Sequence, residues 1–237
     1  MSRIGEIQTP LPAPQAVLIG LLATMVVAGR TLWDIVNHAE TVVHEGAHVL
    51  VGMITGRTIR SVKIGKDGGG STDMVPKSGA GYGLAAFVGY IGSSAAGLIA
   101  AKLISVGHIV IVLFLGLLVC VVMLLLVRNL FGGRVILICG VLLYLVLRYM
   151  TAGVETVVAY GVTWFLLISG TRIAFEAIRR PKDVADAEIL FRMTSLFRSA
   201  WCFLWLTGTV AALVVGGAIL THALCEDANR PLYRSSI

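Results

Sequence analysis

Apolar runs of nearly bilayer-spanning length follow one another through most of this sequence. A transmembrane α-helix needs about 20 consecutive, mostly apolar residues, and only short polar breaks separate the runs. Hydrophobic residues make up 57% of the 237 residues and charged residues only 14%, which is far from the balance of a soluble globular protein. We therefore predict an all-α polytopic membrane protein of about six to seven transmembrane helices. The predicted spans are residues 15–29, 32–55, 81–103, 109–127, 135–147, 154–168 and 199–220.

This spacing of apolar runs leaves no room for a separate soluble domain. We interpret residues 1–237 as a single integral membrane domain, with an N-terminal lead over 1–14, a membrane core over 15–220 and a tail over 221–237. A cleaved signal peptide is the alternative for the first span. The segment before it carries only Arg3 against Glu6, and Arg30 follows it in a poor cleavage context, so a retained helix is favoured.

The second predicted span contains the pattern His-Glu-x-x-His, within residues 41–50. Helical residues four apart lie on one face, so His44 and His48 can bind one zinc ion together. Glu45 lies about 100° around the helix, near enough to reach a water on the metal without binding the metal itself. Zinc hydrolases need this combination of ligands, an open coordination position and a nearby base. The alternative is a pair of buried helix histidines that bond to their neighbours.

The motif span also carries Asp34, His38 and Glu40, an unusual number of ionisable residues for a bilayer helix. Because charged groups are costly in a membrane, we expect them to face the protein interior or a water-filled cavity. Asp34 and His38 are four residues apart in the half of the helix away from the motif, and the alternative for them is an interfacial pair. The third span holds a stretch of small residues over 89–97, which allows close approach to a neighbouring helix. We predict that this neighbour is the motif helix.

The polar segment after the motif span favours β-structure. Residues 58–64 alternate and are rich in β-branched side chains, 65–70 form a glycine-rich turn, and 71–75 have the pattern of a returning strand. The glycines do not match a phosphate-binding loop, because the P-loop pattern is absent and no helix follows directly. We predict a small β-hairpin beside the motif, with an edge that can pair with an extended peptide.

The other polar breaks, tryptophans and cysteines give weaker signals. Asn129 lies in the break at 128–134, where a cap or turn role competes evenly with a role in the site. Trp201 and Trp205 lie near the start of the last span and are predicted to anchor it at the membrane interface. The cysteines show no C-x-x-C spacing, and we interpret them as small buried hydrophobes and not as disulfide partners or metal ligands. They are Cys120, Cys139, Cys202 and Cys225.

The net charge of +6 is typical of basic loops beside a membrane and is not a nucleic-acid signal here. Lys and Arg gather in the predicted hairpin, in 128–134 and in 172–198, and such loops mark the cytoplasmic side. This places the N-terminus, the hairpin, Asn129 and Asp186 on the cytoplasmic side. His44 and His48 would then lie within the membrane, about 12 to 18 Å from that end of their helix.

Together these features resemble the site-2 protease family of intramembrane zinc metallopeptidases, and most closely its compact bacterial branch, often called B-like. The resemblance covers about residues 30–206 and rests on the metal motif, the hairpin, the Gly-Tyr-Ile-Gly-Ser-Ser stretch and the segments 128–132 and 185–187. It implies a multi-pass protein of the bacterial plasma membrane that hydrolyses peptide bonds of a membrane protein or peptide at or inside the lipid bilayer. It also implies that His44 and His48 bind zinc and that Glu45 is the general base.

The resemblance is incomplete at the third zinc ligand. Better-known site-2 proteases supply an aspartate from an Asn-x-x-Pro-x-x-x-Leu-Asp-Gly motif, which this sequence lacks. Asp186 matches the aspartate of the compact branch and lies on the predicted active-site side, so we predict it as the third ligand. The alternative for Asp186 is a solvated or helix-capping carboxylate, with Asp183 and Asn129 as reserve ligands. Asn129 is predicted to bind substrate, holding its backbone or the developing oxyanion.

Two other functions remain open at this stage. A non-catalytic relative would keep the fold as a membrane binding or regulatory module, although the intact Glu45 argues against it. A small transporter would use the polar second span to line a path, but transporters more often show paired broken helices in related halves, and we find no internal repeat. Bound metal separates the protease from the transporter. Cleavage that depends on Glu45 separates it from the non-catalytic relative.

Overall fold

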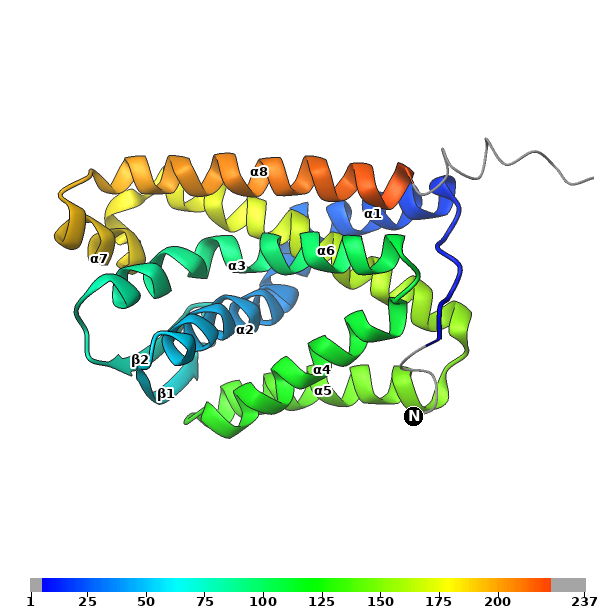
Figure 1. The fold of residues 1–237 in the computed structure, drawn as a ribbon, viewed down its shortest axis with the longest axis horizontal. Coiled ribbons are helices and arrows are strands. Elements are labelled where there is room, and N and C mark those ends of the chain that lie inside the picture. The colour runs from blue at the N-terminus through cyan, green and yellow to red at the C-terminus, as the bar shows by residue number, and fades with distance from the viewer. Residues whose placement is uncertain (1–5, 223–237) are drawn as a thin grey trace, which may run out of the picture.

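The chain folds into a helical bundle with one small hairpin at its end (Figure 1). The computed structural model describes residues 6–222. Within them, a mostly helical architecture and a two-stranded antiparallel sheet directly after the second helix confirm the predicted fold class. The elements are α1 (Ala13–Ala28), α2 (Arg30–Ile54), β1 (Thr58–Ile64), β2 (Gly70–Val75), α3 (Ala80–Ser105), α4 (Ile109–Leu126), α5 (Leu130–Tyr149), α6 (Ala152–Arg179), the 3₁₀ helix η1 (Pro181–Asp183), α7 (Ala185–Thr194) and α8 (Arg198–His222).

Five helices of the described chain are long and apolar enough to cross a membrane: α3, α4, α5, α6 and α8. Helices α1 and α2 pass the same test when taken together, and they are bent by 99° against each other. The described residues therefore offer five spans, or six if this bent pair counts as one. Helix α1 alone has 16 residues, which cover about 24 Å at 1.5 Å per residue, less than the hydrocarbon core of about 30 Å.

The bend between α1 and α2 lies at Gly29, where the backbone is extended. It leaves the start of α1 at the opposite end of the bundle from the hairpin (Figure 1). The Gln8 amide, just before α1, donates to the Gly107 carbonyl in the turn between α3 and α4, at 2.9 Å. The structure therefore differs from the prediction of two separate first spans with the N-terminal segment on the hairpin side.

Helix α3 is the central helix and packs against α2, α6 and α8. Its small residues allow close approach on both sides. A Cβ atom at Gly92 would lie 2.4 Å from the Cβ of Ala47 on α2, and one at Gly97 would lie 2.9 Å from Leu167 on α6. This confirms that the stretch of small residues packs against the motif helix.

Helix α6 extends further than the apolar pattern indicated. The predicted span ends at residue 168, whereas α6 continues to Arg179. Arg172 holds this extension against the bend between α1 and α2, because its guanidinium lies 4.2 Å from the centre of the Trp33 ring and donates to the Val27 carbonyl. A polar stretch that looked like a loop is thus partly helical.

Trp205 on α8 is a core residue. Its side chain is fully buried, its ring stacks on Tyr90 with 4.4 Å between centroids, and its Nε1 donates to the Phe87 carbonyl at 2.9 Å. The prediction that Trp205 anchors the membrane interface is therefore wrong. The indole instead fixes α8 against α3 beside the motif helix.

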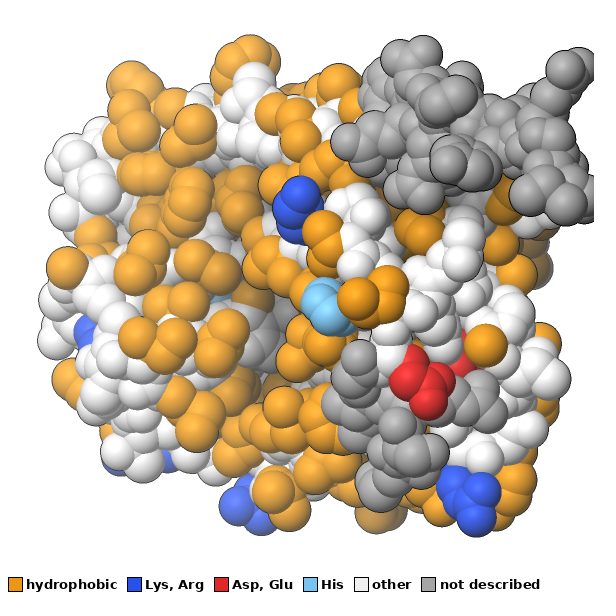
Figure 2. Space-filling view, turned by 45° about the vertical axis from the view of Figure 1, so that its right-hand side comes forward, with side chains coloured by type: hydrophobic (Ala, Val, Ile, Leu, Met, Phe, Trp, Pro, Cys, Tyr) orange, Lys and Arg blue, Asp and Glu red, His pale blue; other side chains and the backbone are white. Residues whose placement is uncertain are grey.

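Apolar side chains cover much of the outer surface (Figure 2), as expected of a protein whose helices face lipid. On α5, only Gly132 and Ile136 are buried. Cys120 and Cys202 are buried in the bundle, as predicted, whereas Cys139 is half-buried and Cys225 lies outside the described residues.

The two edges of the hairpin differ. Strand β1 pairs with β2 from Thr58 opposite Val75 to Ile64 opposite Gly70. The other edge of β1 is covered by the connection between α4 and α5, through a parallel bridge from Val62 to Val127 and a hydrogen bond from the Arg128 amide to the Val62 carbonyl. Within residues 6–222, β2 has no strand on its outer side. Residues of β2 line the pocket described next.

Candidate metal centre

The two motif histidines lie on one face of α2, as their spacing predicts. The Nδ1 atom of His48 lies 2.8 Å from the Ala85 carbonyl on α3, which leaves its Nε2 atom free for another partner. Gly89 on α3 makes room for both rings, because a Cβ there would come 2.5 Å from His48 and 2.9 Å from His44. The small-residue stretch of α3 therefore shapes the floor beneath the histidines.

Asp186 meets the two histidines from the first turn of α7. Its Oδ2 atom lies 3.4 Å from Nε2 of His44 and 3.3 Å from Nε2 of His48. The ligand atoms of the three residues lie within 4.8 Å of one another, so the cluster could hold a metal ion. Tetrahedral zinc with bonds of about 2.0–2.2 Å places its ligand atoms roughly 3.3–3.5 Å apart. The distances to Asp186 fit that spacing.

The two histidines shift the pKa of Asp186. Its burial acts to raise the pKa, but the charge of His48 and the hydrogen bonds with both histidines outweigh burial and hold the pKa of this carboxyl well below its usual range. A carboxylate with two imidazole nitrogens is a donor set that suits zinc. The distances within the cluster and its donor atoms therefore both fit a zinc site.

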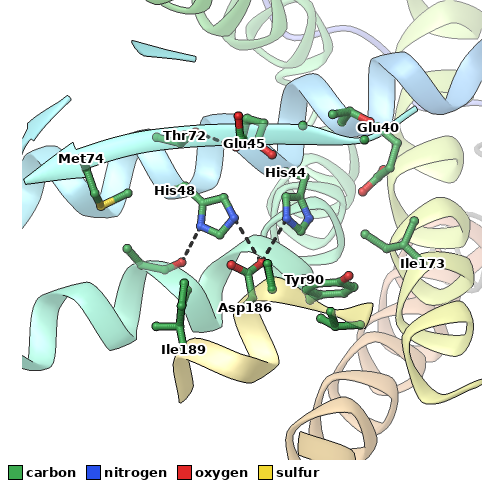
Figure 3. A pocket seen from close by; sticks show the side chains of 18 of the residues that line it. Glu40, His44, Glu45, His48, Thr72, Met74, Tyr90, Ile173, Asp186 and Ile189 are labelled. Carbon is green, nitrogen blue, oxygen red and sulfur yellow. Dashed lines mark hydrogen bonds and ion pairs between the residues drawn. The ribbon is translucent and has the colours of Figure 1, made fainter. Parts of the chain in front are cut away.

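Glu45 lies on the other side of the histidines from Asp186, against the hairpin (Figure 3). Its side chain is only 3% exposed, and its Oε2 atom accepts a hydrogen bond of 2.6 Å from Oγ1 of Thr72 on β2. Gly70 lets the strand come this close, because a Cβ there would lie 2.4 Å from Oε1 of Glu45 and 2.7 Å from Cγ2 of Thr41. The hairpin is therefore packed directly against the motif helix.

Gly70→Ala is expected to push β2 away from α2 and to lower any activity that depends on Glu45. A displacement of about 1 Å at a catalytic group can cost roughly 100-fold in rate. Gly69→Ala is the matched control, since a Cβ at Gly69 would meet its nearest atom at an ordinary 3.5 Å. Turnover of both variants, measured beside wild type, checks this. Equal turnover in both would mean that the contact between Gly70 and Glu45 is unimportant.

The cluster and Glu45 line one pocket of about 420 Å³, between α2, β2, α3 and α7. Its wall also contains Asp183 and Glu40. The Glu40 side chain is 2% exposed and accepts hydrogen bonds from Ser93 on α3 and Ser169 on α6. Glu40 thus faces the protein interior, as expected for an ionisable residue in this helix, whereas Asp34 is exposed and does not.

Asn129 lies outside this pocket. Its Nδ2 atom donates to the Ile64 carbonyl at 2.7 Å, and its Oδ1 atom accepts from the Ile64 amide at 3.1 Å. The side chain therefore bonds to β1 as a neighbouring strand would. It precedes α5 without making a side-chain cap bond.

Sequence reasoning missed the residues that surround the motif. Thr72, Gly70 and the Ala85 carbonyl were not singled out, nor were the serines that bond to Glu40. A signal for the hairpin contact was present, since strand alternation places Gly70, Thr72 and Met74 on one face. The apolar Met74 marks that face as the buried one, and it is 3% exposed.

Comparison with known protein families identifies a family that covers most of the chain. A family model described as peptidase M50B-like matches residues 17–216, which include the motif, the hairpin and Asp186. No curated protein and no solved structure matches the chain.

Proposed function

Because the chain belongs to the peptidase M50B-like family, a site-2 protease family, we propose that it is an intramembrane zinc metalloprotease. It hydrolyses peptide bonds of membrane-associated proteins or peptides. The observation that carries this proposal is the convergence of His44, His48 and Asp186 in one pocket with Glu45. A base beside a possible metal cluster is the arrangement that metal-assisted hydrolysis requires.

Each residue of the site has a distinct role in this proposal. His44, His48 and Asp186 bind the metal, and the Ala85 carbonyl orients the ring of His48. A zinc ion, when bound there, would supply a water of lowered pKa and would polarise the peptide carbonyl. Glu45 takes the proton of the attacking water and passes it to the leaving amine. Its burial against β2 keeps the carboxylate out of bulk solvent.

The free edge of β2 is the proposed substrate site. In an antiparallel pair, residues alternate between those whose N–H and C=O groups face the partner strand and those whose groups face away. Both backbone groups of Ile64 bond to Asn129, away from β2, so its partner Gly70 also faces outward. Thr72, two residues on, does the same. Their backbone groups are available to an extended peptide beside Glu45.

Hydrogen exchange tests this edge directly. Adding the unfolded protein β-casein to the inactive Glu45→Gln variant is expected to slow amide exchange at Gly70 and Thr72. The amide of Ile64 is already bonded to Asn129 and is the internal control. Unchanged exchange at both β2 amides, with β-casein demonstrably bound, would place the substrate elsewhere. Asn129, predicted to bind substrate, would in this proposal support β1 through Ile64 and would not contact the peptide itself.

The hairpin end of the bundle is proposed to face the cytoplasm. Basic residues gather there, in the hairpin, in the connection between α4 and α5 and around η1 and α7. The segment around Gln8, at the other end of α3, would then lie on the outer side. Labelling a cysteine introduced at Ser78, which is exposed in the connection from β2 to α3, tests this orientation in intact cells. Labelling by a membrane-impermeant reagent from outside would contradict it.

Zinc-dependent cleavage is the test of the function as a whole. Purified protein, reconstituted with β-casein and with a panel of single-span membrane proteins, is expected to produce new fragments detectable by mass spectrometry. A protein that binds zinc but cleaves none of these would be a non-catalytic family member. A protein that binds no metal would contradict the protease function and favour the non-catalytic relative.

A further inference from the structure

Thr72 connects the hairpin to the motif helix at a chemically important atom. Its Oγ1 atom donates to Oε2 of Glu45 at 2.6 Å, across 27 residues of sequence. Within residues 6–222 this is the one hydrogen bond that the Glu45 carboxylate receives. Among the hydrogen bonds of the described residues, none joins the Thr72 side chain to His44, His48 or Asp186. Its contact is with the general base of the proposed reaction alone.

The two oxygens of Glu45 have different surroundings. Oε2 is fixed by the Thr72 hydroxyl, whereas Oε1 lies beside the bare Cα of Gly70, where a Cβ would come within 2.4 Å. A glutamate side chain rotates about several bonds, and holding it in one orientation needs packing or a hydrogen bond. Thr72 supplies that hydrogen bond and leaves Oε1 available to accept a proton.

The backbone of Thr72 can bond to a second partner, the substrate peptide. Its N–H and C=O groups face the free edge of β2, in the same alternation as those of Gly70. A peptide that pairs with this edge would therefore bond to the same residue whose hydroxyl holds Glu45. Thr72 would therefore pair with the substrate through its backbone and orient Glu45 through its hydroxyl.

We propose that Thr72 is a positioning residue, which orients the Glu45 carboxylate and couples it to the peptide paired along β2. This inference rests on the proposed protease function. It assigns the hairpin a part in the chemical step as well as in holding substrate. Removal of the hydroxyl is therefore expected to lower kcat more than it changes KM.

The test compares Thr72→Val, which keeps the shape and removes the hydroxyl, with Thr72→Ser, which keeps the hydroxyl. With β-casein as the substrate, we expect kcat of Thr72→Val to fall roughly 10- to 100-fold, the range for losing a hydrogen bond to a charged group. KM and bound zinc should stay within about twofold of wild type, since neither ligand nor strand is removed. Thr72→Ser should recover most of kcat.

A readout independent of activity separates positioning from a structural role. Amide exchange across residues 58–75 of the free protein should be the same in wild type, Thr72→Val and Thr72→Ser. Faster exchange in Thr72→Val, with a raised KM, would overturn the proposal by showing that the hydroxyl merely holds the hairpin. Wild-type kcat in Thr72→Val would overturn it while leaving the protease function intact. Absence of cleavage in wild type itself would overturn both.

Discussion

Glu45→Gln is expected to abolish peptide-bond cleavage while leaving the metal in place. The amide has nearly the same shape as the carboxylate but cannot accept the proton of the attacking water. General acid–base catalysis contributes about 10²- to 10⁴-fold, so residual cleavage should fall by at least that range. Glu45 lies on the other side of the histidines from Asp186 and is not part of the metal cluster, which is why bound metal should not change.

Cleavage of β-casein and zinc content, measured on the same preparation, check this result. Glu176→Gln is the matched control, because it makes the same change at an exposed α6 residue whose partner is Arg172. Cleavage that persists at the wild-type rate in Glu45→Gln would remove the base from the mechanism. Loss of zinc together with cleavage would instead mean that Glu45 supports the metal site.

Asp186→Ala is expected to weaken zinc binding by at least about 100-fold. Mutating outer partners of metal ligands already costs 10- to 100-fold, and Asp186 contacts both histidines directly at 3.3 and 3.4 Å. Removal would also leave two imidazoles without the carboxylate that lies between them. The chain would retain two ligands, fewer than the three that catalytic zinc sites use.

Competition with a chromophoric chelator measures this affinity, and Asp183→Ala is the control. Asp183 lines the same pocket from η1 but is not among the three clustered residues. Wild-type zinc affinity in Asp186→Ala, with loss in Asp183→Ala, would transfer the third ligand to Asp183. Loss in both would mean that the connection between α6 and α7 folds only around the metal.

The metal motif and the hairpin could be recognised from sequence because both are local patterns. Four-residue spacing fixes the faces of His44 and His48 whatever surrounds them, and β-branched alternation around a glycine turn specifies a hairpin. Asp186 is different, since it lies far along the chain from the histidines. It was predicted through resemblance to a family and not through spacing.

Features that depend on packing could not be predicted in this way. The bond from Thr72 to Glu45 needs the hairpin to fold back on α2, and no pattern within either segment specifies that distance. The bend at Gly29 follows from how α1 packs against α6 and α8, although the apolar runs suggested two separate spans. Trp205 resembles an interface anchor by position, yet its ring is buried against Tyr90.

Asn129 shows the same limit for a single side chain. Its place between two apolar runs suggested a cap or a substrate contact, and either role would use the amide group. In the fold the amide bonds to both backbone groups of Ile64. That partner is set by the bridge between β1 and the connection of α4 to α5, which only the assembled bundle creates.

The zinc content of the wild-type protein tests the central claim most directly. Protein purified in mild detergent without chelators, and measured by mass spectrometry of the metal against amino-acid analysis, is expected to contain about one zinc per chain, as a single three-ligand site requires. The His44→Ala variant, prepared in parallel, should contain almost none. Wild-type protein without zinc, or with equal zinc in His44→Ala, would contradict the account.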